Sequence, residues 1–422
     1  MLHKPKLYIV AMSLVALCAL APVAFNAVVD PYDHNRLFDF DLDKQEISVK
    51  AHYPLYKMIE YPRLKAPTVV LGDSRARALK DKYWHELGRS DVYNFAYGGA
   101  TVFEMYDTFD YLRKNVELDT LIVSLPLRSM DERFKSGMNR VPEAIDLASN
   151  PFGYYTNWFV AKIGWRLLEH RYPETFQLPE DFVPSFISSA NATSFRDEGE
   201  ISVEDLLDPA LCHECALKTP DTPIIVPTMF RHHGLGMGRW AAYWPEIDIK
   251  RSLPKLFAKQ VGTNGAADWR RFRQSDRLWQ MVEEMAQWCD ENNVKLVFLI
   301  PPTISEMQKR IGDFGLMTAN HAFRDRLTKM GPVVDLDYDT SFTRDLENFT
   351  DAYHFSSDPA RRIVGELLQV IDTDPKRLAE AAENRRGLIC PVRTSDITNR
   401  HADGSLELLE GQSCRIWRQR NG

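Results

Sequence analysis

Short apolar segments that alternate with helical segments are the feature that most constrains the fold of this chain. Each segment is nearly free of charged residues, and most contain β-branched residues. The candidate strands lie at Thr68–Leu71, Val92–Phe95, Leu121–Val123, Lys295–Ile300 and Val333–Leu336. Because short, continuously apolar strands separated by helices usually pair in parallel and are covered on both faces, the pattern predicts an α/β protein with a parallel sheet.

Amphipathic helical patterns lie between and after these strands. Apolar residues recur at three- and four-residue spacing from Val102 to Leu112, and again in the stretch from Asp268 to Cys289, which Asn292 and Asn293 end. A last helix is expected to open with Asp358 as its N-cap and Pro359 at its first position, because these residue types are preferred there.

The regular alternation stops between residues 131 and 265, which we interpret as a long, mostly helical or irregular insertion. Its aromatic residues form either a small core of their own or a surface for sugars; they include Tyr154, Tyr155, Trp158, Trp165, Trp240 and Trp244. The predicted organisation is a membrane anchor (1–30), a juxtamembrane segment (31–64), the two parts of the α/β core (65–130 and 266–373) around the insertion (131–265), and a C-terminal extension (374–422).

An uncharged stretch from Leu7 to Val29 follows Lys4 and Lys6 near the N-terminus. It is long enough to cross a hydrocarbon core of ~30 Å at ~1.5 Å per residue. The preceding lysines predict a cytoplasmic N-terminus, with the rest of the chain exported. We therefore expect a single-pass protein of the bacterial inner membrane with its bulk in the periplasm. The alternative is a signal peptide cleaved near Ala24–Ala27.

Charge and cysteine content limit the partners further. Lys and Arg number 52 and Asp and Glu number 59, so the net charge is −7 and nucleic acid is not an expected partner. Of the six cysteines, Cys18 lies in the expected anchor, and the other five allow two disulfides that leave Cys289 free. Cys212 and Cys215 form a CxxC pair, for which zinc or redox chemistry is the alternative to a disulfide. We expect no metal and no cofactor.

Two polar segments follow predicted strands and together suggest nucleophilic catalysis. Gly72-Asp73-Ser74 lies at the carboxyl end of the first strand, the edge of a parallel sheet where sites form. Asp351 and His354 lie between the last strand and the final helix. A serine hydroxyl needs a base within ~3 Å, and the base needs a group that orients it. The alternatives are an ordinary turn and a polar loop before a helix.

A third segment, Asn94 to Thr101, also follows a strand. Its glycines would let the backbone approach a substrate and offer an N–H group; the alternative is a plain turn between strand and helix.

In their order along the chain, the three segments resemble the blocks of the SGNH (GDSL-type) hydrolase and acyltransferase superfamily. The resemblance implies a flavodoxin-like three-layer α/β/α fold. It implies Ser74 as nucleophile, His354 as base and Asp351 as the residue that orients the base. It also implies that the backbone N–H groups of Ser74 and Gly99 are the donors of the oxyanion hole.

One departure from the family pattern concerns the third block, which usually supplies an asparagine side chain to the oxyanion hole. The segment Leu121–Ser129 contains no asparagine, and one such donor is typically worth ~2.7–4 kcal/mol in the transition state. Either Arg128 or Ser129 substitutes, the hole is built differently, or the site is weak or inactive. Arg75 and Arg128 are the candidate substrate-binding residues. Arg75 either attracts an anionic sugar or is simply paired at the surface.

A narrower resemblance extends over Val29–Tyr32, Val70–Arg75 and Tyr93–Thr101. These segments look like exported SGNH-like proteins of bacterial exopolysaccharide machinery. That resemblance implies transfer or removal of acetyl groups on an envelope polysaccharide, with a membrane-bound O-acyltransferase as a partner. Two alternatives stay open: a non-catalytic subunit that binds polysaccharide or a membrane partner, and a plain carboxylesterase of small esters.

Overall fold

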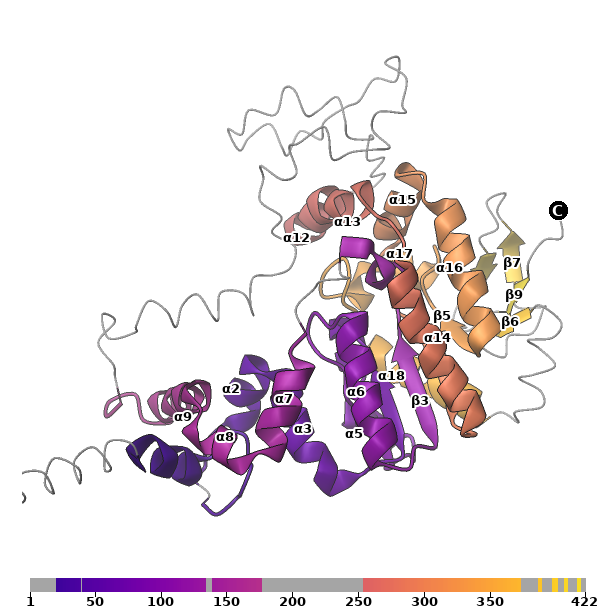
Figure 1. Ribbon diagram of the computed structural model, residues 1–422. Coiled ribbons are helices and arrows are strands. Elements are labelled where there is room, and N and C mark those ends of the chain that lie inside the picture. Colours follow the sequence, from indigo (N-terminus) through magenta and orange to yellow (C-terminus); the bar gives the residue numbers. More distant parts are fainter. Residues whose placement is uncertain are drawn as a thin grey trace, which may run out of the picture. The chain divides into compact units, whose positions relative to one another are not determined.

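The computed structural model describes residues 20–38, 40–133, 139–176 and 253–372, and the backbone of four short strands between residues 386 and 418 (Figure 1). The chain forms two compact units. The first, here called the helical unit, joins Met1–Lys65 with Asn139–Phe195. The second, the sheet unit, joins Ala66–Met138 with Arg196–Gly422.

A parallel five-stranded sheet is the centre of the sheet unit and confirms the α/β prediction. Its strands, in the order β2-β1-β3-β4-β5, are β2 (Val92–Asn94), β1 (Thr68–Leu71), β3 (Thr120–Ser124), β4 (Lys295–Ile300) and β5 (Val333–Asp335). The chain runs from β1 to β2 on one side and then crosses to β3 on the other. The strand order therefore reverses between β1 and β3, and ligands of such sheets bind beyond the carboxyl ends at this point.

Helices cover both faces of the sheet (Figure 1). On one face, strand residues such as Val70, Ile122 and Val297 share a buried core with α5 (Asp81–Glu86) and α18 (Ser357–Ile371). On the other face, α6 (Val102–Asn115), α14 (Asp276–Glu291) and α16 (Met317–Met330) pack together through aromatic rings. Gly331, which ends α16, lies against Leu296 and Phe298, whose side chains point away from the first core.

The other helical segments among the described residues of the sheet unit are short. They are α4 (Ser74–Arg77), η1 (Leu127–Met130), α12 (Lys255–Lys259), the π-helical turn η9 (Gln260–Asn264), α13 (Gly265–Arg270), α15 (Ser305–Asp313), α17 (Ser341–Arg344) and η10 (Leu346–Asn348). In the C-terminal segment, β6 (Arg386–Leu388) pairs with β9 (Ile416–Arg418), and β7 (Ile397–Arg400) pairs with β8 (Leu406–Leu408), both antiparallel.

Two predicted helix starts are wrong. The pattern that begins at Asp268 contains two helices, because α13 ends at Arg270 and the side chain of Ser275 caps α14 by accepting the Leu278 N–H. The N-cap position of the last helix is Ser356 and not Asp358, and the Ser356 side chain makes no capping hydrogen bond. The chain leaves a β-bridge between Phe349 and Phe355 and enters the helix at once, so Asp358 falls in its first turn.

The helical unit is formed by two segments that are far apart in the sequence. A helix described over residues 20–29, α2 (Lys44–Ala51) and α3 (Tyr53–Leu64) come from the N-terminal segment. The helices α7 (Val141–Ser149), α8 (Pro151–Thr156) and α9 (Trp158–Arg171) come from the expected insertion. The Asn26 side chain donates to the carbonyls of Tyr155 (2.8 Å) and Asn157 (3.0 Å). Part of the expected insertion thus packs with the end of the expected anchor, through Asn26, and with the expected juxtamembrane segment, in which His34 Nε2 lies 3.2 Å from the Ala148 carbonyl.

Some of the sequence-based expectations concern residues that are not described. Met1–Ala19, Trp240, Trp244 and every cysteine except Cys289 lie outside the described residues; Cys289 is a buried free thiol. Among the residues that are described, no helix is both long enough and apolar enough to span a bilayer.

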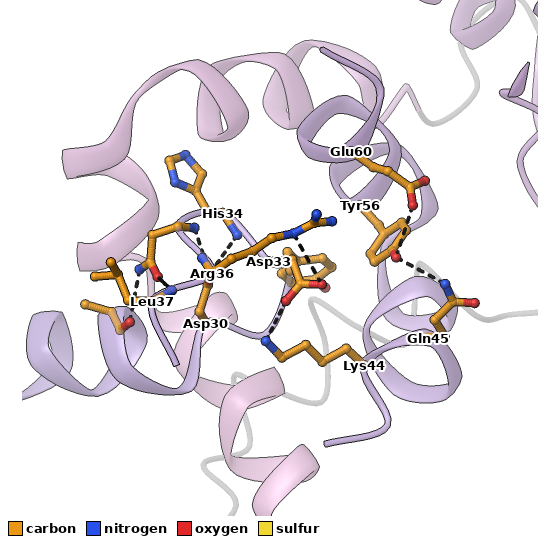
Figure 2. A network of polar contacts seen from close by, with 12 residues as sticks. Asp30, Asp33, His34, Arg36, Leu37, Lys44, Gln45, Tyr56 and Glu60 are labelled. Atoms are coloured by element: carbon orange, nitrogen blue, oxygen red, sulfur yellow. Dashed lines mark hydrogen bonds and ion pairs between the residues drawn. The ribbon is translucent and has the colours of Figure 1, made fainter. Parts of the chain in front are cut away.

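A buried carboxylate organises the loop after the helix of residues 20–29 (Figure 2). Asp30 is fully buried, and its carboxylate accepts the backbone N–H groups of His34 (2.8 Å), Asn35 (2.9 Å) and Arg36 (2.9 Å). The Tyr154 hydroxyl of α8 donates to the same carboxylate at 3.1 Å. These bonds fix a loop in which Asp30 and Arg36 both have positive φ, an unfavourable conformation for residues other than glycine.

We expect Asp30→Asn to destabilise the helical unit by about 2–4 kcal/mol, because the amide NH₂ would face N–H groups that now donate to the carboxylate. Asparagine tolerates the positive φ, so the change isolates the hydrogen bonds. The matched control is Asp33→Asn, which removes two partly exposed ion pairs, with Lys44 (2.6 Å) and with Arg36 (3.9 Å), and should cost no more than about 1 kcal/mol. Urea unfolding of the two proteins measures the difference, and equal losses would contradict the role of Asp30.

Candidate active site

Ser74 lies where β1 turns into α4, beside the point at which the strand order reverses. Gly72 permits this turn. A Cβ atom on Gly72 would lie 2.6 Å from Cβ of Ala76 and 2.7 Å from Cβ of Ser124, so glycine lets the chain pass close to the end of β3. Ser74 itself is partly accessible to solvent.

Asp73 and Arg75 form a buried ion pair on either side of Ser74. Arg75 Nη2 lies 2.5 Å from Asp73 Oδ2, and the Arg75 backbone N–H donates to Asp73 Oδ1 at 2.9 Å. Burial raises the pKa of Asp73, but the Arg75 guanidinium outweighs this effect and the pKa is lowered. Arg75 is therefore paired, as one of the two alternatives predicted, but the pair is buried and does not lie at the surface. A role for Arg75 in substrate binding stays a prediction.

The loop that carries His354 is folded around the carboxylate of Asp351. Asp351 Oδ1 accepts the backbone N–H groups of Tyr353 (2.8 Å) and His354 (2.9 Å). Asp351 Oδ2 lies 2.8 Å from His354 Nδ1. Burial raises the pKa of Asp351, but the hydrogen bond from His354 and the backbone N–H groups outweigh it, so the pKa lies below its ordinary value. The group is therefore an anion at neutral pH.

Ser74, His354 and Asp351 lie in one hydrogen-bonded chain. Ser74 Oγ is 2.7 Å from His354 Nε2, although the two residues are 280 positions apart in the sequence. Because the carboxylate of Asp351 can only accept, it selects the imidazole tautomer with the proton on Nδ1. Nε2 is then left as an acceptor for the Ser74 hydroxyl. The His354 side chain is 37% exposed, so reagents can reach this pair from solvent.

Gln260, in the π-helical turn η9, holds the same loop from the other side. Its Oε1 accepts the Ala352 backbone N–H at 2.7 Å. The Ile304 N–H donates to the Ala352 carbonyl at 3.2 Å. Both backbone groups of the residue after Asp351 are therefore satisfied, which restrains the loop. Sequence reasoning missed Gln260 because no local signal marks a contact between residues 92 positions apart.

Asp268 links the His354 loop to the end of β3. The Tyr353 hydroxyl donates to Asp268 Oδ2 at 3.0 Å, and Arg128 Nε lies 2.8 Å from Asp268 Oδ1. Burial and the neighbouring Asp268 carboxylate raise the pKa of Tyr353 well above its ordinary value, so the phenol stays protonated and donates. Arg128, a predicted substrate-binding residue, is thus within an ion pair at the edge of the sheet that carries Ser74.

We expect Tyr353→Phe to lower kcat on an acetyl ester about tenfold with little change in KM, because a loosened loop misplaces the imidazole. The matched control is Tyr106→Phe, which removes a hydroxyl that donates to Glu284 at 2.5 Å between α6 and α14. Steady-state kinetics of both variants and the wild type measure the changes in kcat and KM. An equal loss in the control would mean that the Tyr353 hydroxyl only supports the fold.

The Asn94–Thr101 segment is held against β1 and α4. Asn94 Nδ2 donates to the carbonyls of Ala76 and Leu79, both at 2.8 Å. The Tyr97 N–H donates to the Gly72 carbonyl at 3.0 Å. Gly99 follows in an exposed turn with φ of 65°, a conformation that favours glycine. The structure thus brings this segment beside the turn that carries Ser74. That the backbone N–H groups of Ser74 and Gly99 are oxyanion donors stays a prediction.

Within the described ranges, no three His, Cys, Asp or Glu side chains come together as a metal site. Comparisons with protein-family models and with curated proteins find no match for this chain.

Proposed function

We propose that the protein is an SGNH-like enzyme that forms an acyl-enzyme on Ser74. The observation that carries the proposal is the hydrogen-bonded chain from Ser74 through His354 to Asp351. The strand order 2-1-3-4-5 is that of flavodoxin-like sheets and supports the finer fold assignment. Ser74 directly after β1 and His354 just before α18 also agree with the order of elements that the resemblance implies, which supports their proposed roles as nucleophile and base.

In the first half of the reaction, His354 Nε2 takes the proton of the Ser74 hydroxyl as Oγ bonds to the acyl carbon. The carbonyl electrons move to oxygen, and the oxyanion is held by backbone N–H groups, for which Ser74 and Gly99 are the candidates. When the tetrahedral intermediate collapses, the ester C–O bond breaks and the leaving oxygen takes the proton from His354. Asp351 stabilises the imidazolium in between.

The second half repeats these steps with a hydroxyl acceptor. His354 removes the acceptor's proton, the acceptor oxygen bonds to the acyl carbon, and Ser74 Oγ leaves and is reprotonated. A sugar hydroxyl as acceptor gives a transferase and water gives an esterase. From the narrower resemblance we propose that the substrate is an envelope or exopolysaccharide, that the acyl group is acetyl, and that a membrane-bound O-acyltransferase is a partner in the periplasm.

The alternative function is a non-catalytic subunit that binds polysaccharide or serves as a scaffold. It is favoured by one observation, the absence of an asparagine from Leu121–Ser129. A site without that donor would keep its geometry but lose much of its transition-state stabilisation.

A fluorophosphonate probe separates the two functions, because it reacts covalently only with an activated serine. We expect intact-mass spectrometry to show one adduct on the wild-type protein and none on Ser74→Ala. Labelling should be strongly slowed in His354→Ala, which keeps the hydroxyl but removes its base. Equal labelling of wild type and His354→Ala, or no labelling at all, would favour the non-catalytic subunit.

A further inference from the structure

Large apolar side chains that are exposed to solvent gather in the helical unit. Of those found among the described residues, only Leu87 and Leu256 belong to the sheet unit. In the helical unit they include Leu20, Val28, Leu37, Phe38, Phe152 and Trp158. Trp158 is 58% exposed and Phe152 77% exposed. Such a concentration on one compact unit is typical of a surface that contacts a protein or a membrane.

One side of the helix of residues 20–29 is packed and the other is not. Phe25 and Val29 pack against Gly164 of α9 so closely that a Cβ there would lie 3.0 and 3.2 Å from them. On the opposite side, Leu20, Ala24 and Val28 recur at four-residue spacing and are all exposed. The side chains of these three residues are entirely apolar.

Two other segments bring apolar residues to the same helix. The Asn26 side chain donates a hydrogen bond to the carbonyl of Asn157, the residue before Trp158. The Asn35 side chain donates to the Ala27 carbonyl at 3.0 Å and accepts the Leu37 N–H at 2.7 Å. The segments that carry Leu37 and Trp158 are therefore both hydrogen-bonded to the C-terminal half of the helix. We call Leu20, Val28, Leu37 and Trp158 the apolar face.

We propose that the apolar face lies in the interfacial layer of an anionic phospholipid bilayer, so that the helical unit rests on the membrane. Three features select lipid as the occupant. The exposed helix side continues the uncharged sequence Leu7–Ala19, whose apolar composition suits a lipid environment. Tryptophan is the residue type most enriched at the headgroup level. α9 also carries Lys162, Arg166 and His170 beyond Trp158, which complement anionic headgroups. This proposal does not depend on the proposed acyl chemistry.

The test reconstitutes the full chain in anionic vesicles whose phospholipids are brominated near the glycerol end of the acyl chains. Bromine quenches only indoles that lie within the bilayer. We expect Trp158→Phe to lose most of the quenched emission, because Trp158 is the tryptophan of the apolar face and an indole at the headgroup level meets these bromines. The matched control, Trp288→Phe in α14 of the sheet unit, should leave the quenching unchanged.

A second variant keeps Trp158, whose fluorescence is measured, and changes another residue of the apolar face. Leu37→Asp places a charge on the apolar face and should reduce the quenching of Trp158 while near-ultraviolet circular dichroism stays native. Vesicle-bound protein whose quenching is the same in wild type and Trp158→Phe would overturn the proposal, because the chain would then be held by its N-terminal segment alone. A dimer in detergent that Leu37→Asp dissociates, without quenching in vesicles, would assign the face to a second copy and also overturn it.

Discussion

Replacing Ser74 by alanine is expected to reduce hydrolysis of a chromogenic acetyl ester by roughly 10⁴-fold or more, because removing the nucleophile of a serine triad leaves only the residual effect of binding and the oxyanion hole. The hydroxyl is the atom that bonds to the acyl carbon, and it lies 2.7 Å from its proposed base. The change removes one oxygen from a partly exposed residue, so the fold should remain intact. Initial rates of acetate release measure the effect.

The matched control is Ser149→Ala in the helical unit. The Ser149 hydroxyl donates to the Ile145 carbonyl of its own helix at 2.8 Å and has no part in the site. Its removal should leave the rate unchanged. Full ester hydrolysis by Ser74→Ala, with the control equally active, would remove Ser74 from the mechanism.

Asp351→Asn is expected to lower kcat by about 10⁴-fold, the size of effect that follows when an asparagine selects the wrong histidine tautomer in a serine triad. The amide oxygen of the new side chain can still accept the backbone N–H groups of Tyr353 and His354, so the loop should keep its shape. The amide NH₂ group can donate to His354 Nδ1 but cannot accept from it. The imidazole would then carry its proton on Nε2 and could no longer accept the Ser74 proton.

Asp345→Asn tests whether this loss is specific. Asp345 caps η10 in the same region by accepting the Glu347 N–H at 3.0 Å, and asparagine caps equally well. Its kcat should match the wild type. A rate for Asp351→Asn within a few fold of the control would mean that Asp351 shapes the loop without orienting the base.

The strands were predictable because their signal is local. Each of the five strands is continuously buried or nearly so, and a continuous apolar run is what such burial requires. The Asp351–His354 pair was also predictable, since a carboxylate that accepts the N–H groups two and three residues later is a local turn. Sequence alone suggested that Ser74 joins them, but the 2.7 Å separation between Ser74 Oγ and His354 Nε2 required the three-dimensional arrangement of β1 and α18.

The supports of the site were not predictable, because they join distant segments whose residues are individually ordinary. Gln260 reaches Ala352 from a π-helical turn, and Asp268 accepts from Tyr353 while it pairs with Arg128. No spacing pattern in the sequence indicates these contacts, although Arg128 was a candidate for substrate binding. The helical unit was missed for the same reason, since its two halves lie on either side of the first part of the α/β core.

The most direct test of the central claim is to trap the acyl-enzyme. The full chain is mixed with an isotopically labelled acetyl ester, quenched in acid within the first turnover, digested and mapped by mass spectrometry. We expect one labelled acetyl group on the peptide that contains Ser74, absent from Ser74→Ala and accumulating far more slowly in His354→Ala. Acetyl label on another residue, or ester turnover with no label on the Ser74 peptide, would contradict the account.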